Sequence, residues 1–198
     1  NDRTVLKDIS FEVKKGEVLG IVGAPGSGKS TLAHLIPRFY EVSSGRITID
    51  GQDVRSLTLS SLRSAVSLVQ QENFLFDTSV HNNVAYSEPQ AGEERVIEAA
   101  SVAQIHEHVE QLPKGYTTRV GERGVALSGG QRQRMTIARG LLDQPSILVL
   151  DDSTAAIDPA TEQRVRAALQ SSLQNTATII IAHRLSSLKH ADQIIVLD

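Results

Sequence analysis

Near its N-terminus the chain reads Gly23-Ala24-Pro25-Gly26-Ser27-Gly28-Lys29-Ser30, followed by Thr31. It matches the phosphate-loop pattern G-x-x-x-x-G-K-[ST]. The glycines let successive backbone N–H groups converge on phosphate oxygens without obstruction by side chains. Lys29 would neutralise the β- and γ-phosphates of a nucleotide, and the Ser30 hydroxyl would ligate Mg²⁺. The stretch therefore predicts a site for nucleotide phosphates.

The residues on either side of the loop agree with such a site. Val18–Val22 is a nearly all-apolar run, which is typical of a parallel strand buried on both faces. Thr31–Phe39 has the apolar spacing of a helix, and the positive end of its dipole would face the phosphates. A flexible glycine-serine turn is the alternative interpretation, and the position of the motif between strand and helix argues against it.

A carboxylate stands at the end of a second apolar run. Ile147–Leu150 reads as a buried strand, and Asp151 follows it directly. Ligands of open α/β sheets bind at the carboxyl ends of the strands, so Asp151 is placed to hold the hydrated Mg²⁺ that bridges the phosphates. Apolar strands that end in Asp are common, and this prediction depends on the pairing with the phosphate loop.

The rest of the chain alternates strands and helices at both ends and is helical in the middle. Further strands are expected at Val5–Val13, Arg46–Asp50, Ser67–Val69, Thr178–Ala182 and Gln193–Leu197. Helical patterns cover residues 79–111 and 127–142. This order predicts an α/β fold with a parallel core and an inserted helical lobe, whose boundaries lie near residues 73 and 140.

Composition and charge exclude several classes of protein. The 198 residues carry 20 Lys+Arg and 23 Asp+Glu, and the net charge of −3 argues against nucleic acid as the main partner. The absence of Cys removes disulfides, thiolate catalysis and zinc–thiolate sites. No apolar run approaches the roughly 20 residues that span a bilayer. The chain begins without Met or a signal peptide, so we expect it to be a piece of a longer protein.

A second glycine-containing motif precedes a basic helical stretch. It reads Leu127-Ser128-Gly129-Gly130-Gln131. Adjacent glycines at the start of a helix expose N–H groups and the helix dipole to an anion. The alternative is a capped loop–helix junction with Ser128 as N-cap. A domain that binds one nucleotide needs a second phosphate site only if two chains share their nucleotides.

The phosphate loop, the Leu127–Gln131 motif and the Asp151 strand occur in the order and approximate spacing of an ABC-type ATPase domain. The chain resembles this family over essentially its whole length. Three further positions agree, since Gln71 resembles the Q-loop glutamine, His183 the switch histidine and Asp158 the D-loop aspartate.

The resemblance implies a P-loop NTPase with a mainly parallel, RecA-like core at residues 1–72 and 141–198, N-terminal antiparallel β strands and a helical signature subdomain at 73–140. It implies ATP and Mg²⁺ as ligands. ATP would be bound by Gly23, Ala24, Pro25, Gly26, Ser27, Gly28, Lys29, Ser30 and Thr31. The metal would be held by Ser30, Gln71 and Asp151, and the catalytic residues would be Asp152, His183 and Gln71.

In this family two ATPase domains pack head to tail, so each ATP lies between the phosphate loop of one chain and the signature of the other. The resemblance therefore implies a second ABC ATPase domain as partner, identical or different. Ser128, Gly129, Gly130 and Gln131 would contact the partner's nucleotide, and Asp158 would communicate across the dimer. The other partners would be transmembrane domains that this chain lacks, which implies a position at the cytoplasmic face of a membrane.

The segment Thr118–Gly124 resembles the one that precedes the signature in ABC exporters and couples to intracellular loops of the transmembrane domains. Phe74–Phe76 and Asn82–Tyr86 favour the same subfamily. A charged surface turn is the alternative for Thr118–Gly124. Two other functions stay open: a soluble ABC ATPase of DNA repair or translation, and a regulatory module that binds nucleotide without hydrolysis. The exporter-like segment argues against the first, and Lys29 and His183 against the second.

The chain departs from the family pattern at one catalytic position. The family usually places a Glu after the Asp151 strand to polarise the attacking water, and this chain has Asp152. The shorter side chain loses roughly 1.5 Å of reach, and a misplacement of about 1 Å can cost about 100-fold in rate. We therefore expect a slow site, as in the degenerate half of a heterodimeric exporter. A homodimer with a slower Asp152 is the alternative.

Overall fold

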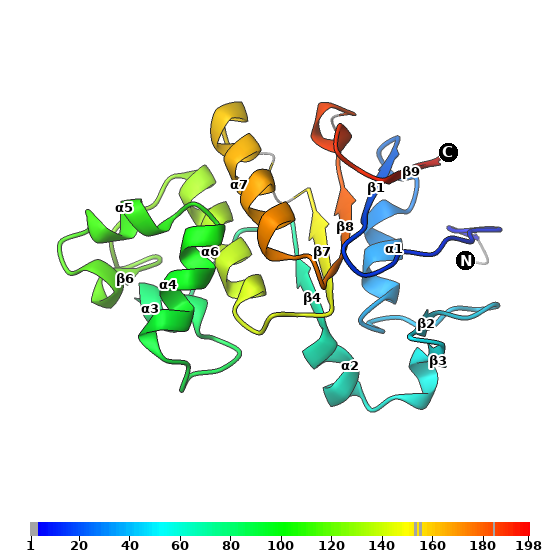
Figure 1. Ribbon diagram of the computed structural model, residues 1–198, viewed down its shortest axis with the longest axis horizontal. Helices are drawn as coiled ribbons and strands as arrows, with labels where there is room; N and C mark the ends of the chain where they lie inside the picture. Colours follow the sequence, from blue (N-terminus) through cyan, green and yellow to red (C-terminus); the bar gives the residue numbers. More distant parts are fainter. Residues whose placement is uncertain (1–3, 153, 155, 184) are drawn as a thin grey trace. The chain divides into compact units, whose positions relative to one another are not determined.

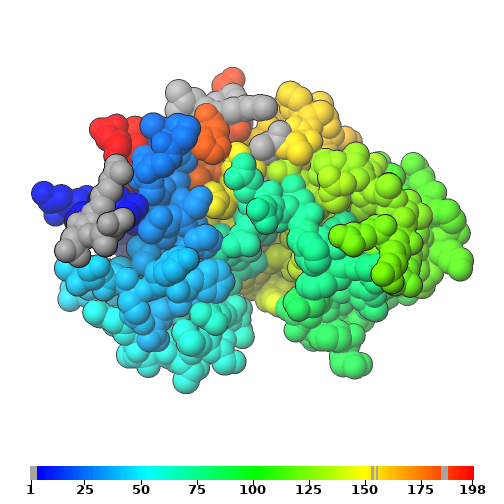
Figure 2. Space-filling model, turned by 180° about the vertical axis from the view of Figure 1, so that it is seen from behind, coloured from blue at the N-terminus to red at the C-terminus, as the bar shows by residue number. Residues whose placement is uncertain are grey.

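The computed structural model describes residues 4–152, 154, 156–183 and 185–198. The chain divides into two compact units. The first comprises Asn1–Leu68, Pro145–Asp152 and Asn175–Asp198, and the second comprises Val69–Gln144 and Ser153–Gln174. Both ends of the chain therefore belong to the first unit. The red C-terminal residues lie beside the blue N-terminal ones in both views (Figure 1 and Figure 2).

A five-stranded sheet with the order β4-β7-β8-β1-β9 forms the centre of the first unit. Its strands are β1 (Val18–Gly23), β4 (Val66–Val69), β7 (Ile147–Asp151), β8 (Ala177–Ile181) and β9 (Gln193–Leu197). β1 pairs in parallel with β8 and β9, and β7 pairs in parallel with β8. The predicted α/β fold with a mainly parallel sheet is confirmed.

Apolar side chains from both ends of the sequence form the core of this unit. Leu19 and Ile21 of β1 pack with Val149 of β7 and Ile179 of β8, all 4% exposed or less. Helix α1 (Lys29–Leu35) contacts β1 and β7 and adds Leu32 and Ala33 to this core. Burial on both faces explains why these strands are continuous apolar runs in the sequence.

The antiparallel strands of the N-terminal half are β2 (Thr48–Ile49) and β3 (Gln52–Asp53), joined by a turn at Asp50-Gly51. The predicted strand Val5–Val13 is wrong, because the described residues of this run form no strand. Asp8 has a φ of 53°, which interrupts an extended chain. The apolar side chains of this run pack individually against the core of the unit, namely those of Leu6, Ile9, Phe11 and Val13.

The remaining elements of the first unit are short. They are the 3₁₀ turn η1 (Val54–Ser56), helix α2 (Leu59–Ala65) and the 3₁₀ turn η3 (Leu185–Leu188). Helix α2 was not predicted from the sequence. It begins after Thr58, whose side chain accepts a hydrogen bond from the Ser61 N–H. Only three of its seven residues are apolar, namely Leu59, Leu62 and Ala65, which is too few to establish a helical period.

Helices dominate the second unit. They are α3 (Val80–Val84), α4 (Glu93–Val102), α5 (His106–Glu110), α6 (Gly129–Leu141) and α7 (Pro159–Ser172), with the 3₁₀ turn η2 (Gly115–Thr117). The short strands β5 (Thr78–Ser79) and β6 (Arg119–Val120) pair antiparallel. Helix α6 contacts α3 and α4, and its buried Met135 and Ile137 are 0% exposed. None of the helices in the described part of the chain has both the length and the apolar character of a membrane span.

Candidate functional site

The register of the sheet gathers the predicted phosphate and metal residues of the first unit at one edge. Asp151 pairs with Ile181, and Ile181 pairs with Ile21, so the three form one row across β7, β8 and β1. The phosphate loop begins just beyond this row at Gly23, and His183 follows β8. Since all three strands run in parallel, their carboxyl ends meet at this edge, where open α/β sheets bind ligands.

The backbone of the phosphate loop requires glycine at several positions. Gly26 and Gly28 have φ angles of 84° and 94°, which side chains rarely adopt. A Cβ at Gly23 would lie 2.3 Å from the Leu197 carbonyl oxygen and 2.6 Å from Ser27 Oγ. The absence of a side chain at Gly23 therefore allows the loop to leave β1 close to the neighbouring strand β9.

Lys29 is the buried cation of this loop. Its side chain is only 6% exposed, and Nζ donates hydrogen bonds to the carbonyl oxygens of Gly23 (2.7 Å) and Ala24 (2.8 Å). A buried charge needs partners, and an ammonium has three protons, of which the two carbonyls accept two. Ser27 Oγ of the same loop is buried and has no hydrogen-bond partner among the described residues. The loop thus offers a positive charge and an unused hydroxyl to an anion.

The residues at this edge fit Mg²⁺ that is bound together with phosphate. The described residues contain no group of three or more His, Asp or Glu that would hold a metal by themselves. Asp151 is 7% exposed at the end of β7 and supplies one carboxylate, and the exposed Ser30 supplies a hydroxyl. Mg²⁺ is usually held by one or two protein oxygens with substrate phosphates and water, which agrees with this donor set.

Asp152 and His183 approach each other at the same edge. Asp152 Oδ2 lies 4.0 Å from His183 Nε2, with the carboxylate 14% and the imidazole 45% exposed. The Asp152 backbone has a φ of 45°, and its N–H donates to the Ile181 carbonyl oxygen at 2.9 Å. Asp tolerates the left-handed region better than most side chains, because its short polar group can bond locally.

The Leu127–Gln131 motif begins helix α6 with a capping box. Ser128 Oγ accepts from the Gln131 N–H at 3.3 Å, and Gln131 Oε1 accepts from the Ser128 N–H at 2.8 Å. Ser128 is exposed. Its hydroxyl uses a lone pair for the cap and keeps its proton, so capping does not prevent donation to an anion. The motif can therefore cap the helix and contact an anion at the same time.

Contacts inside the second unit hold the segment with Asp158 against helix α6. A Cβ at Gly130 would lie 2.9 Å from the Ala156 carbonyl oxygen, so a glycine permits this approach. The Ala156 N–H donates to Gln133 Oε1 at 2.8 Å, a contact that the sequence analysis did not predict. Asp158 is the N-cap of α7 and accepts from the Thr161 N–H at 3.0 Å, which lowers the pKa of the Asp158 carboxyl.

The predicted residues fall on both units. The phosphate loop, Asp151, Asp152 and His183 belong to the first unit, and the signature motif and Asp158 to the second. Gln71 belongs to the second unit and lies exposed in a bend after β4. Ser153, Ala155 and Arg184, which adjoin the predicted motifs, lie outside the described residues.

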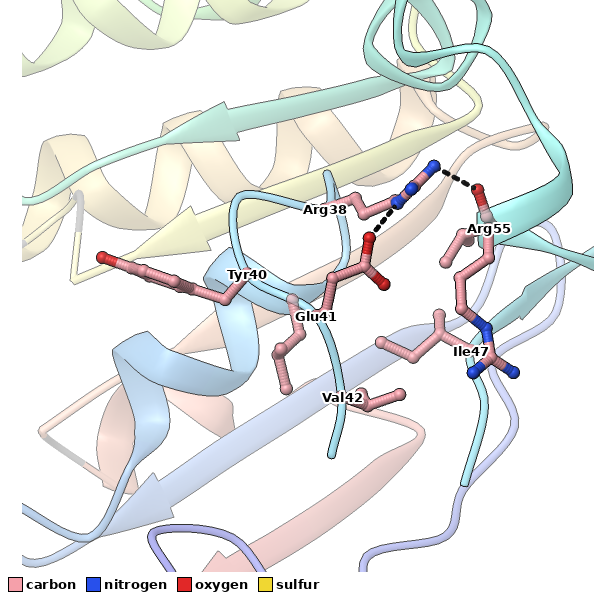
Figure 3. Close-up of a pocket in the computed structure, with 8 residues that line it drawn as sticks. Arg38, Tyr40, Glu41, Val42, Ile47 and Arg55 are labelled. Atoms are coloured by element: carbon pink, nitrogen blue, oxygen red, sulfur yellow. Dashed lines mark hydrogen bonds and ion pairs between the residues drawn. The ribbon is translucent and has the colours of Figure 1, made fainter. Parts of the chain in front are cut away.

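A small pocket near the end of α1 carries no candidate chemistry. It is lined by Leu35, Arg38, Tyr40, Glu41, Val42, Ile47, Val54 and Arg55 (Figure 3). Arg38 Nε donates to Glu41 Oε1 at 2.7 Å, and an Arg38 guanidinium nitrogen lies 3.4 Å from the Val54 carbonyl oxygen (Figure 3). Arg38 therefore pairs with Glu41 and with the backbone, and Arg55 pairs with the carboxylate of Asp53 outside the pocket.

Comparison with known proteins agrees with this geometry. The sequence model of the ABC transporter family matches residues 6–155. Putative multidrug export ATP-binding/permease proteins of Staphylococcus aureus strains COL and N315 are 48% identical over all of this chain, which spans 34% of their length. A solved structure of a bacterial Atm1-family ABC exporter with ATP bound is 46% identical and superposes with a TM-score of 0.94, covering 100% of this chain and 34% of that one. The chain therefore belongs to the ABC transporter family and is an ATPase domain.

Proposed function

We propose that this domain pairs head to tail with a second ABC ATPase domain and that the pair encloses two Mg·ATP. The observation that supports the proposal is that two groups of residues suited to contact an anion lie on separate units of one chain. The first is the phosphate loop with the buried Lys29 ammonium, and the second is the start of α6 with the exposed Ser128 hydroxyl. One nucleotide on one chain would use only the first of them.

In the proposed site, Lys29 neutralises the β- and γ-phosphates and gives up its bonds to the loop carbonyls as it does so. Ser30 and Asp151, with Gln71, would hold Mg²⁺, which supplies charge neutralisation of the phosphates when bound. Asp152 would orient the attacking water, and His183 would donate to the γ-phosphate. Positioning and charge, rather than covalent chemistry, would carry the reaction.

The Asp152 carboxylate supports the proposal of a slow site. Its reach is one methylene shorter than that of the usual Glu, and in-line attack depends on the position of the water. The signature of this chain is intact, so it would complete a competent site on a partner while its own phosphate loop retains ATP. We favour a heterodimer on this ground, and a homodimer that hydrolyses ATP slowly is the alternative.

The free energy of ATP hydrolysis would drive export of a substrate across a membrane. The relatives are named as multidrug export ATP-binding/permease proteins, and this chain spans 34% of their length. The domain would therefore act at the cytoplasmic face of a membrane, and closure and reopening of the ATPase pair would drive the transmembrane part.

The molecular mass of the chain in solution tests the pairing. Asp152→Asn removes the carboxylate but retains a residue that tolerates a positive φ, so the variant should bind ATP and hold it. If identical chains pair, its mass by light scattering should double with Mg·ATP and return to that of a monomer with Mg·ADP. A second change, Ser128→Arg, should prevent the doubling without loss of ATP binding. A mass that does not change with saturating Mg·ATP would contradict pairing of identical chains.

A further inference from the structure

A histidine outside the family motifs contacts the signature glutamine. His108 lies on α5, and its Nδ1 atom is 3.4 Å from the side-chain nitrogen Nε2 of Gln131. The two residues are 23 positions apart. The amide of Gln131 is already oriented by the capping box, because its Oε1 accepts from the Ser128 N–H at 2.8 Å. The Nε2 end of the amide must therefore face His108.

This orientation determines the tautomer of His108. An amide nitrogen can only donate, so Nδ1 of the imidazole must accept and cannot carry a proton. The neutral ring then has its proton on Nε2, an atom that is buried and that no described residue contacts by a hydrogen bond. A protonated ring would place an N–H at Nδ1 against the N–H₂ group of Gln131, where two donors face each other.

The surroundings favour the neutral ring. Burial and the positive charge of Arg134 on α6 lower the pKa of His108. The other titratable groups of α5 are His106, Glu107 and Glu110, and Tyr116 of η2 and Glu93 of α4 lie near this helix. His106 Nδ1 is 2.9 Å from the Tyr116 hydroxyl and its Nε2 is 3.6 Å from Glu110 Oε2, so these groups bind one another. Burial raises the pKa of Tyr116 to about 12, so it stays neutral while His108 titrates.

We propose that His108 is a positioning residue for the signature: its neutral ring accepts from the Gln131 amide, fixes the capping box and so holds the Ser128 hydroxyl for the partner's nucleotide. Only the contact between the Ser128 hydroxyl and the partner's nucleotide rests on the proposed function. Protonation of His108 breaks the contact with Gln131, and the presentation of Ser128 becomes weaker in acid.

Nuclear magnetic resonance of the chain tests the contact without any nucleotide. The ¹⁵N shifts of His108 should show an unprotonated Nδ1 at neutral pH and a midpoint below the usual histidine value. The side-chain amide of Gln131 and the backbone amide of Ser128 should titrate with the same midpoint. A proton on Nδ1, or Gln131 and Ser128 signals that do not follow His108, would overturn the proposal.

Two substitutions distinguish the contribution of the Nδ1 hydrogen-bond acceptor of His108 from that of its ring shape. His108→Phe keeps the ring shape without an acceptor, and we expect its maximal ATP turnover to fall about two- to tenfold, the equivalent of one hydrogen bond. His108→Asn keeps an acceptor near the Nδ1 position that cannot be protonated, so it should restore turnover at neutral pH and lose the acid decline of the unmodified chain. His190→Asn, at an exposed histidine, is the matched control and should keep the pH profile.

The two readouts distinguish failure of this inference from failure of the proposed function. Absence of ATP hydrolysis in both the unmodified chain and Asp152→Glu would count against the proposed function, and the resonance titration would still decide the contact between His108 and Gln131. Equal turnover and equal pH profiles in the unmodified chain, His108→Phe and His108→Asn would overturn the positioning role.

Discussion

The side-chain Oε1 atom of Gln133 accepts a hydrogen bond of 2.8 Å from the backbone N–H of Ala156. Gln133 lies on the signature helix α6 and is 1% exposed, and Ala156 lies two residues before Asp158. The same helix approaches Ala156 through Gly130. The signature and the D-loop segment of the second unit are thus parts of one packed structure.

Loss of this contact should destabilise the second unit. Gln133→Leu keeps the volume and removes the acceptor, and we expect the free energy of unfolding to fall by about 0.5–1.5 kcal/mol, the net contribution of a typical hydrogen bond. Urea denaturation followed by circular dichroism measures it. Gln170→Leu, at an exposed position of α7, is the control and should change stability by less than about 0.5 kcal/mol. Equal effects of the two changes would contradict the role of Gln133.

A methyl group at Gly23 should disturb both the loop and the sheet. The added Cβ would meet the Leu197 carbonyl oxygen at 2.3 Å, and backbone atoms cannot move aside as a flexible side chain can. We expect Gly23→Ala to lower stability by about 1–3 kcal/mol, the usual cost of overpacking, and to weaken ATP binding. A Cβ at Gly92 meets nothing within 4 Å, so Gly92→Ala should retain ATP binding. Thermal melts and ATP titrations of both variants check this, and normal binding by Gly23→Ala would contradict it.

The Lys29 ammonium should contribute strongly to nucleotide affinity. Lys29→Met keeps the apolar stem and removes the charge, and we expect the Kd for Mg·ATP to rise about 10- to 100-fold, the equivalent of a hydrogen bond to a charged group. Isothermal titration calorimetry measures the change. Lys15→Met, at an exposed turn lysine, is the control. If the two variants bind Mg·ATP equally well, Lys29 is not a phosphate ligand.

The Asp158 cap should make the stability of α7 depend on pH. The Thr161 N–H lowers the pKa of Asp158 below its ordinary value of 3.8. The stabilisation is therefore complete above that ordinary value and is lost as the pH falls through the lowered one. Asp158→Ala should lower the melting temperature at neutral pH and remove this part of the acid transition, whereas Asp158→Asn should retain the cap. Identical melting of all three chains would contradict the capping role.

The sequence predicted the elements whose residues are buried on all sides. The strands around Val149 and Ile179 are apolar runs because both faces of the sheet are covered, and the structure has them within one or two residues of the prediction. The run Val5–Val13 was misread because its apolar residues pack singly and Asp8 breaks the extended chain. Helix α7 was not predicted, although Asp158-Pro159 is a strong signal for the start of a helix, because Asp158 was interpreted only as part of the D-loop.

The candidate site was predictable where its residues are close in sequence or, like Asp151, stand at the end of a recognisable apolar strand. The phosphate loop and the capping box of Ser128 and Gln131 lie within a few positions, so their chemistry can be read directly. The contact between His108 and Gln131 and that between Gln133 and Ala156 each join residues 23 positions apart. Such pairs follow from tertiary packing of α5, α6 and the D-loop segment, which no local pattern encodes.

The rate of ATP hydrolysis by the chain alone, measured against protein concentration, tests the central claim most directly. We expect slow turnover in the unmodified chain and turnover about 100-fold faster in Asp152→Glu, because the longer carboxylate reaches the water. The rate of the variant should grow more than linearly with concentration, because two chains complete each site. Melting of both chains should show that the change leaves the fold intact. Fast, concentration-dependent turnover in the unmodified chain that Asp152→Glu leaves unchanged would contradict the slow site.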